Sequence, residues 1–116
     1  MIVGTKVFCA NVGDSRATLA RIQKDKNGVD QVTGIQLSRD HKADEPDEEA
    51  RILRNGGRVQ PYRDMQGNQL GPLRVWHLNE DIPGLAMTRS FGDQAAAQVG
   101  VIAKPELLEM NLVEGD

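Results

Sequence analysis

The first third of the chain alternates apolar and polar side chains in a way that predicts three β-strands. Residues 6–12 carry apolar side chains on both faces, which is typical of a central strand. Residues 16–23 and 31–37 alternate as well, and turn-forming residues at 13–15 and 27–28 separate the three segments. Because strands joined by a short turn usually pair, we expect 6–12 and 16–23 to form an antiparallel hairpin.

The middle of the chain predicts one clear helix. Asp44 is a favourable N-cap, Pro46 suits the first turn, and the pair Gly56-Gly57 suits a helix end. Acidic residues fill the first turn and arginines the last, which complements the helix dipole. A narrow apolar stripe, suited to packing on a sheet, consists of Ala50, Ile52 and Leu53.

The second half contains a loop-rich excursion at about residues 61–83, marked by several Gly and Pro residues. A short strand is expected at 58–60, a short helix at 93–98 and a final strand at 107–112. This order shows no repeated strand–helix–strand alternation. It predicts an α+β fold class, with antiparallel β-sheets and flanking helices.

Composition narrows the classes of function. The net charge is −3 and no cluster of Lys and Arg interleaves with aromatic residues, so we expect no nucleic-acid partner. No apolar stretch approaches the roughly 20 residues that span a bilayer, so no membrane partner is expected. The single cysteine, Cys9, excludes an internal disulfide and suits a reducing compartment, which favours an intracellular location, cytoplasmic or nuclear.

Asp14 is the best single candidate for chemistry. It lies in a tight turn directly after a buried-type strand, where a carboxylate would be held rigidly, and hard cations prefer such oxygen ligands. The alternative is that Asp14 only satisfies backbone groups of the turn. Arg16 could neutralise Asp14 or bind an anion, and a hairpin ion pair is the favoured interpretation.

Asp40, His41 and Lys42 place an acid, an imidazole and an ammonium just before the expected helix. Helix N-termini attract phosphate, but the nearby carboxylates would repel it, so a structural hydrogen-bonding role for His41 is favoured. His77 has no companion at metal-ligand spacing. With two histidines and one cysteine, the chain supports no Ser/His/Asp or Cys/His triad.

Five short motifs in fixed order give the chain a family resemblance. Together they resemble the middle of the type 2C, metal-dependent Ser/Thr protein phosphatases, over about residues 6–116. The motifs are Ala10-Asn11-Val12-Gly13-Asp14-Ser15-Arg16, Ser38-Arg39-Asp40-His41-Lys42, Glu49-Ala50-Arg51-Ile52 leading to Gly56-Gly57-Arg58-Val59, Gly84-Leu85-Ala86-Met87-Thr88-Arg89-Ser90-Phe91-Gly92-Asp93, and Pro105-Glu106.

The resemblance implies that residues 1–116 are the central portion of a single phosphatase-like domain and part of a four-layer α/β/β/α sandwich. Residues 61–83 would be the flap that borders the cleft. The main metal-binding segments of the family would lie before and after this stretch, and their Asp-Gly, Asp-Asn and Asp-Gly-His-Gly motifs are absent here. We therefore expect no complete catalytic set and no firmly bound metal in this chain.

By the same resemblance, the parent domain would be a Mg²⁺- or Mn²⁺-dependent hydrolase. A metal-activated water would attack phosphoserine or phosphothreonine of phosphoprotein substrates. The isolated chain is expected to be inactive, and the alternative is a catalytically dead binding or scaffold module. Incomplete sheets would also expose strand edges, which favours self-association.

The resemblance also implies roles for single residues. Asp14 would contribute to an additional metal site beside the main metal pair. Arg89 would contact phosphate near the cleft or pair structurally with Asp93 or Asp81. The other motif residues singled out are expected to be structural, and they are Gly13, Arg16, Asp40, His41, Gly56, Gly57, Gly92 and Asp93.

Two flap residues complete the candidates. Trp76 and Arg74 could face a substrate from the flap, although a place in a small core is favoured for Trp76. The pair Glu80-Asp81 looks like the metal-binding Glu-Asp pair of the family, but that pair belongs to an N-terminal strand, so we assign it no metal role.

Overall fold

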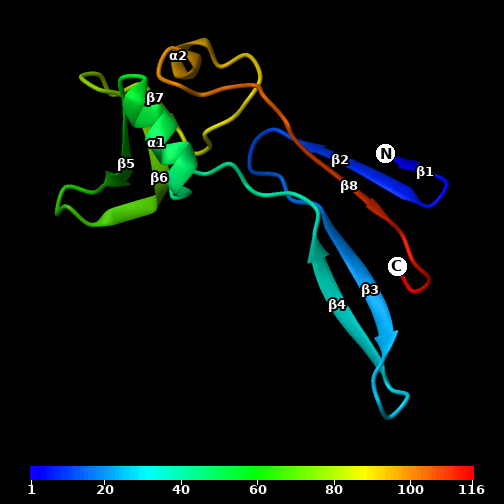
Figure 1. The fold of residues 1–116 in the computed structure, drawn as a ribbon. Helices are drawn as coiled ribbons and strands as arrows, with labels where there is room; N and C mark the ends of the chain where they lie inside the picture. The colour runs from blue at the N-terminus through cyan, green and yellow to red at the C-terminus, as the bar shows by residue number, and fades with distance from the viewer. The chain divides into compact units, whose positions relative to one another are not determined.

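Strand pairing and packing divide the chain into two units in the computed structural model, which describes residues 1–116. The first unit comprises residues 1–11, 15–39 and 105–116, and the second comprises 12–14 and 40–104. Figure 1 labels the elements of both units. All strand pairs between named strands are antiparallel and the helices are few, so the α+β class is confirmed.

The first unit contains a three-stranded sheet in the order β1 (Ile2–Val3), β2 (Lys6–Asn11) and β8 (Glu106–Asn111). β2 lies in the centre, as its apolar residues on both faces predict. The ends of the register pair Lys6 with Asn111 and Asn11 with Glu106. The expected final strand at 107–112 is therefore present and begins one residue earlier.

A second sheet of this unit is the hairpin of β3 (Thr18–Lys24) and β4 (Asp30–Gln36), drawn in blue and cyan in Figure 1. Its turn is fixed by the Asp25 carboxylate, which accepts hydrogen bonds from the N–H groups of Asn27 and Val29 at 2.8 and 2.9 Å. The sequence thus predicted both strands correctly.

The expected hairpin of residues 6–12 with 16–23 is wrong. β2 pairs with β1 and β8, whereas β3 pairs with β4. The backbone groups between β2 and β3 form hydrogen bonds with residues that follow β4. Ala17 N–H donates to Ser38 Oγ at 2.8 Å, and Gly13 bonds to His41. A short connection therefore does not decide pairing when a better partner lies far along the chain.

The second unit packs α1 (Pro46–Arg54) and α2 (Gln94–Ala97) with a sheet in the order β5 (Gly57–Arg63), β6 (Gln69–His77) and β7 (Pro83–Leu85). Its main hydrophobic cluster is aliphatic and consists of Ala43, Ile52, Val75, Ala96, Val99 and Val101. No helix of the chain is long and apolar enough to cross a bilayer.

The helix α1 begins slightly later than expected. Glu45, not Asp44, occupies the N-cap, and its side chain does not cap the helix. Pro46 stands in the first turn, as expected. The end matches the prediction, because Gly56 follows Asn55 with φ of 80°, a backbone conformation that glycine adopts easily.

The buried face of α1 differs from the expected stripe. Ile52 is completely buried, but Leu53 is 53% exposed. Successive helical residues point about 100° apart, so Leu53 turns away from the sheet that Ile52 contacts. Glu48, one turn before Ile52, takes the remaining place on the buried face and is itself fully buried.

The flap-like excursion is largely a regular hairpin. β5 extends through Pro61 to Arg63 instead of ending at residue 60, with a register irregularity between Pro61 and Tyr62, where proline offers no N–H to the ladder. At the tip, the Asp64 carboxylate accepts hydrogen bonds from the N–H groups of Gln66 and Asn68 at 2.9 and 2.7 Å. These bonds give the tip a defined turn.

Candidate functional site

The turn that carries Asp14 is held by one histidine. Gly13 N–H donates to His41 Nδ1 at 3.0 Å, and His41 N–H donates to the Gly13 carbonyl at 2.9 Å. Gly13 has φ of 110°, a backbone conformation that residues with a Cβ rarely adopt, so glycine suits this position. The turn leaves Asp14 exposed to solvent.

The Asp14 carboxylate has the chemistry of one ligand for a hard divalent cation. It is an exposed oxygen donor on a fixed turn, which suits Mg²⁺ or Mn²⁺. Asp14 belongs to no group of three or more ligand side chains with converging atoms. The residues present therefore fit a metal as a single ligand and do not form a centre by themselves.

A buried ionic cluster lies behind this turn in the second unit. The Glu48 carboxylate accepts hydrogen bonds from Thr88 Oγ1 at 2.6 Å, from Arg89 Nη2 at 2.7 Å and from Arg51 Nη2. Thr88 N–H in turn donates to the His41 carbonyl at 2.9 Å. The Glu48 cluster, defined as Glu48, Arg51, Thr88 and Arg89, thus connects α1 to the segment before α2 and to His41.

The protonation of Glu48 follows from these donors. Burial alone would raise the pKa of the Glu48 carboxyl, but the hydrogen bonds from Arg51, Arg89 and Thr88 outweigh burial and hold the pKa well below its ordinary value. Glu48 is therefore an anion inside the unit. Sequence reasoning missed this residue, although its spacing of three from Arg51 and four from Ile52 places it on the buried face.

Arg89 is a structural partner in this arrangement, but its predicted partners were wrong. Its guanidinium pairs with Glu48 rather than with Asp93 or Asp81, and its Nη1 donates to the Lys104 carbonyl at 2.8 Å. Asp81 accepts instead from Arg58. A contact of Arg89 with substrate phosphate stays a prediction, and the bonds observed favour the structural alternative.

Both flap candidates, Trp76 and Arg74, pack against the ring of Tyr62. Trp76 is 5% exposed, donates through Nε1 to the Gln60 carbonyl at 2.9 Å, and meets the Tyr62 ring edge-on with centroids 5.0 Å apart. The Arg74 guanidinium lies 4.8 Å from the centre of the Tyr62 ring and donates to the Gly84 carbonyl at 2.8 Å. Both side chains thus stabilise the flap sheet, and their substrate-facing roles stay predictions.

Of the remaining motif residues, Arg16 belongs to the first unit and the others to the second. Arg16 is exposed in the first unit, and the Asp40 carboxylate lies 3.8 Å from Lys42 Nζ. Gly57 is buried against Ile52, and Gly92 has φ of 79°. Asp93 precedes α2, where its carbonyl accepts from Ala97 N–H at 2.8 Å.

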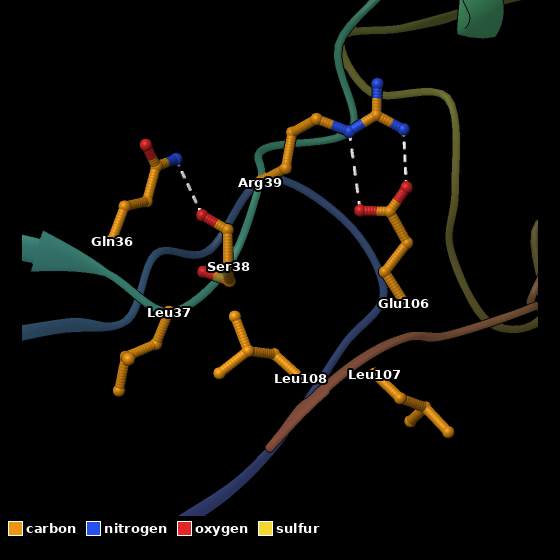
Figure 2. Close-up of a pocket in the computed structure, with 7 residues that line it drawn as sticks. All are labelled: Gln36, Leu37, Ser38, Arg39, Glu106, Leu107 and Leu108. Carbon is orange, nitrogen blue, oxygen red and sulfur yellow. Dashed lines mark hydrogen bonds and ion pairs between the residues drawn. The ribbon is translucent and has the colours of Figure 1, made fainter. Parts of the chain in front are cut away.

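The first unit has a pocket of about 350 Å³ that no predicted site residue lines. Figure 2 shows its charged edge, where the Arg39 guanidinium and the Glu106 carboxylate face each other and form two hydrogen bonds. The apolar lining consists of Leu37, Leu107 and Leu108, and Leu107 is 76% exposed. The pocket therefore offers an apolar surface beside an ion pair.

Comparison with known proteins gives one consistent result. The family model described as "Protein phosphatase 2C" matches residues 1–116. The chain is 40% identical over 113 residues to "Probable protein phosphatase 2C 48" of Oryza sativa subsp. japonica and 42% identical over 113 residues to "Probable protein phosphatase 2C 52" of Arabidopsis thaliana. These alignments cover 97% of this chain but 31% and 22% of the two relatives.

Solved structures agree on the fold. The "serine-threonine phosphatase 2C from Toxoplasma gondii" matches with a TM-score of 0.76 at 23% sequence identity, over 97% of this chain and 35% of that chain. A second structure, of a "C.elegans sex determining protein", matches with a TM-score of 0.62 over 97% of this chain. The chain thus spans about a third or less of the proteins named here.

Proposed function

The chain belongs to the protein phosphatase 2C family, and from this membership we propose that its parent domain hydrolyses phosphoserine and phosphothreonine in phosphoproteins with Mg²⁺ or Mn²⁺. Residues 1–116 are, on this proposal, the central portion of that domain, with the flap at about 61–83. The observation that carries the proposal is the match of the family model over the whole chain. On this proposal the isolated chain is inactive, because Asp14 belongs to no group of converging ligands within it.

Within this function, Asp14 would supply one carboxylate oxygen to a cation. Divalent cations, once held by a complete ligand set, supply a nucleophilic water and neutralise charge on the transferring phosphoryl group. The part of this chain is to present Asp14 on a turn that His41 holds, and to support that turn with the Glu48 cluster. Trp76 and Arg74 stabilise the flap sheet through hydrogen bonds to the carbonyls of Gln60 and Gly84.

A chimera tests this function. Residues 1–116 would replace the matching 113-residue segment of the rice relative, and dephosphorylation of a phosphothreonine peptide would be measured against Mn²⁺ concentration. We expect the chimera to be active, and the Asp14→Ala chimera to need about tenfold more Mn²⁺ for half-maximal rate. The exposed Asp30, which pairs with Lys24 in the hairpin of the first unit, provides the control Asp30→Asn, with no change expected.

The chimera assay has two outcomes that would change the proposal. A chimera that folds, judged by its circular dichroism and thermal transition, yet shows no turnover would contradict the proposal. That result would favour the alternative of a phosphatase-like binding module without catalysis. An active chimera whose Mn²⁺ dependence is the same with and without Asp14 would leave the family function standing and remove Asp14 from the metal site.

A further inference from the structure

The Asp14 turn and His41 belong to different motifs, 27 positions apart in the printed sequence, yet they form one hydrogen-bonded clamp. We propose that His41 is the positioning residue of the Asp14 turn: its ring and its main chain grip Gly13 from both sides, and Thr88 fixes His41 to the buried Glu48. The metal side of this proposal rests on the proposed function, whereas the clamp does not.

His41 bonds to both backbone polar groups of Gly13, the N–H and the carbonyl. The ring nitrogen Nδ1 of His41 accepts from Gly13 N–H at 3.0 Å, and the His41 N–H donates to the Gly13 carbonyl at 2.9 Å. Nδ1 is therefore the unprotonated ring nitrogen. Both peptide planes that flank Gly13 are fixed by these bonds, although glycine has the widest conformational freedom of any residue. The direction in which the chain enters Asp14 is fixed as a result.

The clamp is anchored deep in the second unit. His41 is completely buried, and its carbonyl accepts from Thr88 N–H at 2.9 Å. Thr88 is also completely buried, and its hydroxyl donates to Glu48 Oε2 at 2.6 Å. A continuous path of hydrogen bonds thus runs from Gly13 through His41 and Thr88 to α1, so the turn moves only if a buried polar contact breaks.

This positioning matters for a cation because Asp14 is exposed and offers a single side chain. A carboxylate on a mobile turn must be ordered when the cation binds, and that ordering weakens affinity. Groups behind a ligand that fix its orientation commonly change metal affinity by about tenfold or more when they are removed. His41 has this relation to Asp14 without touching the cation itself.

The clamp is tested first in the unmodified 116-residue chain by nuclear magnetic resonance. We expect a scalar coupling across the hydrogen bond between Gly13 N and His41 Nδ1, and slow exchange of the Gly13 amide hydrogen. The absence of this coupling together with fast exchange of that amide in the folded chain would overturn the clamp. This readout needs no substitution, so it does not depend on whether a variant folds.

Variants then separate positioning from general stability. His41→Asn keeps an acceptor on the γ-carbon and is expected to keep the Gly13 amide protected, whereas His41→Leu removes the acceptor and should speed exchange of that amide by about tenfold or more. The matched control is His77→Leu, since His77 bonds through Nε2 to the Ala95 carbonyl at 2.7 Å and does not contact the turn. Equal Gly13 exchange in His41→Leu and wild type would overturn the proposal.

The metal arm uses Mn²⁺ alone, read as paramagnetic broadening of the Asp14 amide signal. We expect His41→Leu to need about tenfold more Mn²⁺ than wild type for the same broadening, and His41→Asn to stay close to wild type. If wild type itself shows no broadening at Asp14, the ligand role in the proposed function fails while the clamp result stands. The positioning role is overturned if His41→Leu speeds exchange of the Gly13 amide, yet its Asp14 signal broadens at the same Mn²⁺ concentration as in wild type.

Discussion

At the scale of single residues, Glu48 shows how a carboxylate is accommodated inside a small aliphatic core. It is completely buried, and Arg51, Thr88 and Arg89 all donate to it. A buried charge is tolerated when it is paired and hydrogen-bonded in this way, and it is costly when a partner is lost. Glu48 therefore holds α1 to the segment that carries Thr88 and Arg89.

Removal of the Glu48 charge tests this role. Glu48→Gln leaves the buried guanidinium of Arg89 and the partly buried guanidinium of Arg51 without their anion, so we expect the free energy of unfolding to fall by about 3 kcal/mol. Glu49→Gln is the matched control, because Glu49 occupies the same first turn of α1 without the buried contacts, and a change within about 0.5 kcal/mol is expected. Urea denaturation measures both, and equal losses would contradict the role of Glu48.

The lowered pKa of Glu48 also predicts how stability depends on pH. Because the pKa is lower in the folded chain than in the unfolded chain, Glu48 stabilises the fold above the ordinary glutamate pKa of about 4.3, and this contribution is lost progressively as pH falls below that value. The difference in unfolding free energy between wild type and Glu48→Gln should therefore shrink on acidification. A difference that stays constant from neutral pH into the acid range would contradict this origin.

Residue roles were only partly predictable from the sequence. The motif order singled out Asp14 and His41, and a hydrogen-bonding role for His41 followed from its carboxylate neighbour. The partner of Arg89 did not follow, because Glu48 lies 41 positions away in the chain and local patterns say little about which charges meet inside a fold. Burial of a charged residue depends on contacts that form only after the elements pack.

At the scale of elements, the sequence predicted the features that depend on neighbouring residues, such as helix ends and the positions of strands. Gly56 ends α1 where the sequence places the end, and β3 and β4 lie where alternation predicts them. Pairing was not predictable in the same way, since β2 joins β8 at a separation of roughly a hundred residues, and no turn signal reports such a contact. Register over long distances is set by packing of whole sheets.

The two neighbouring apolar residues of α1 give a matched test of its orientation. Ile52 is fully buried and Leu53 is 53% exposed. We expect Ile52→Ala to lower the free energy of unfolding by about 2–5 kcal/mol through cavity formation, and Leu53→Ala to lower it by less than about 1 kcal/mol. Chemical denaturation measures the free energy of unfolding of both variants. A larger loss for Leu53→Ala than for Ile52→Ala would show that the helix faces the sheet differently.

At the scale of the whole chain, the expected metal site at Asp14 has one carboxylate and no converging partners. The chain covers 31% of the rice relative and 22% of the Arabidopsis relative, and no set of converging ligands includes Asp14. Large apolar side chains of the first unit are also exposed, among them Ile2, Val32 and Leu107. Self-association through strand edges stays a prediction that agrees with this exposure.

An assay of the purified 116-residue chain with a phosphothreonine peptide in millimolar Mn²⁺ tests whether Asp14 needs ligands from outside this chain. We expect no more than trace turnover, because a single carboxylate on a clamped turn binds Mn²⁺ weakly. Sustained turnover that disappears both with a metal chelator and in Asp14→Ala would show the opposite, since it would require a complete metal centre built from these residues alone.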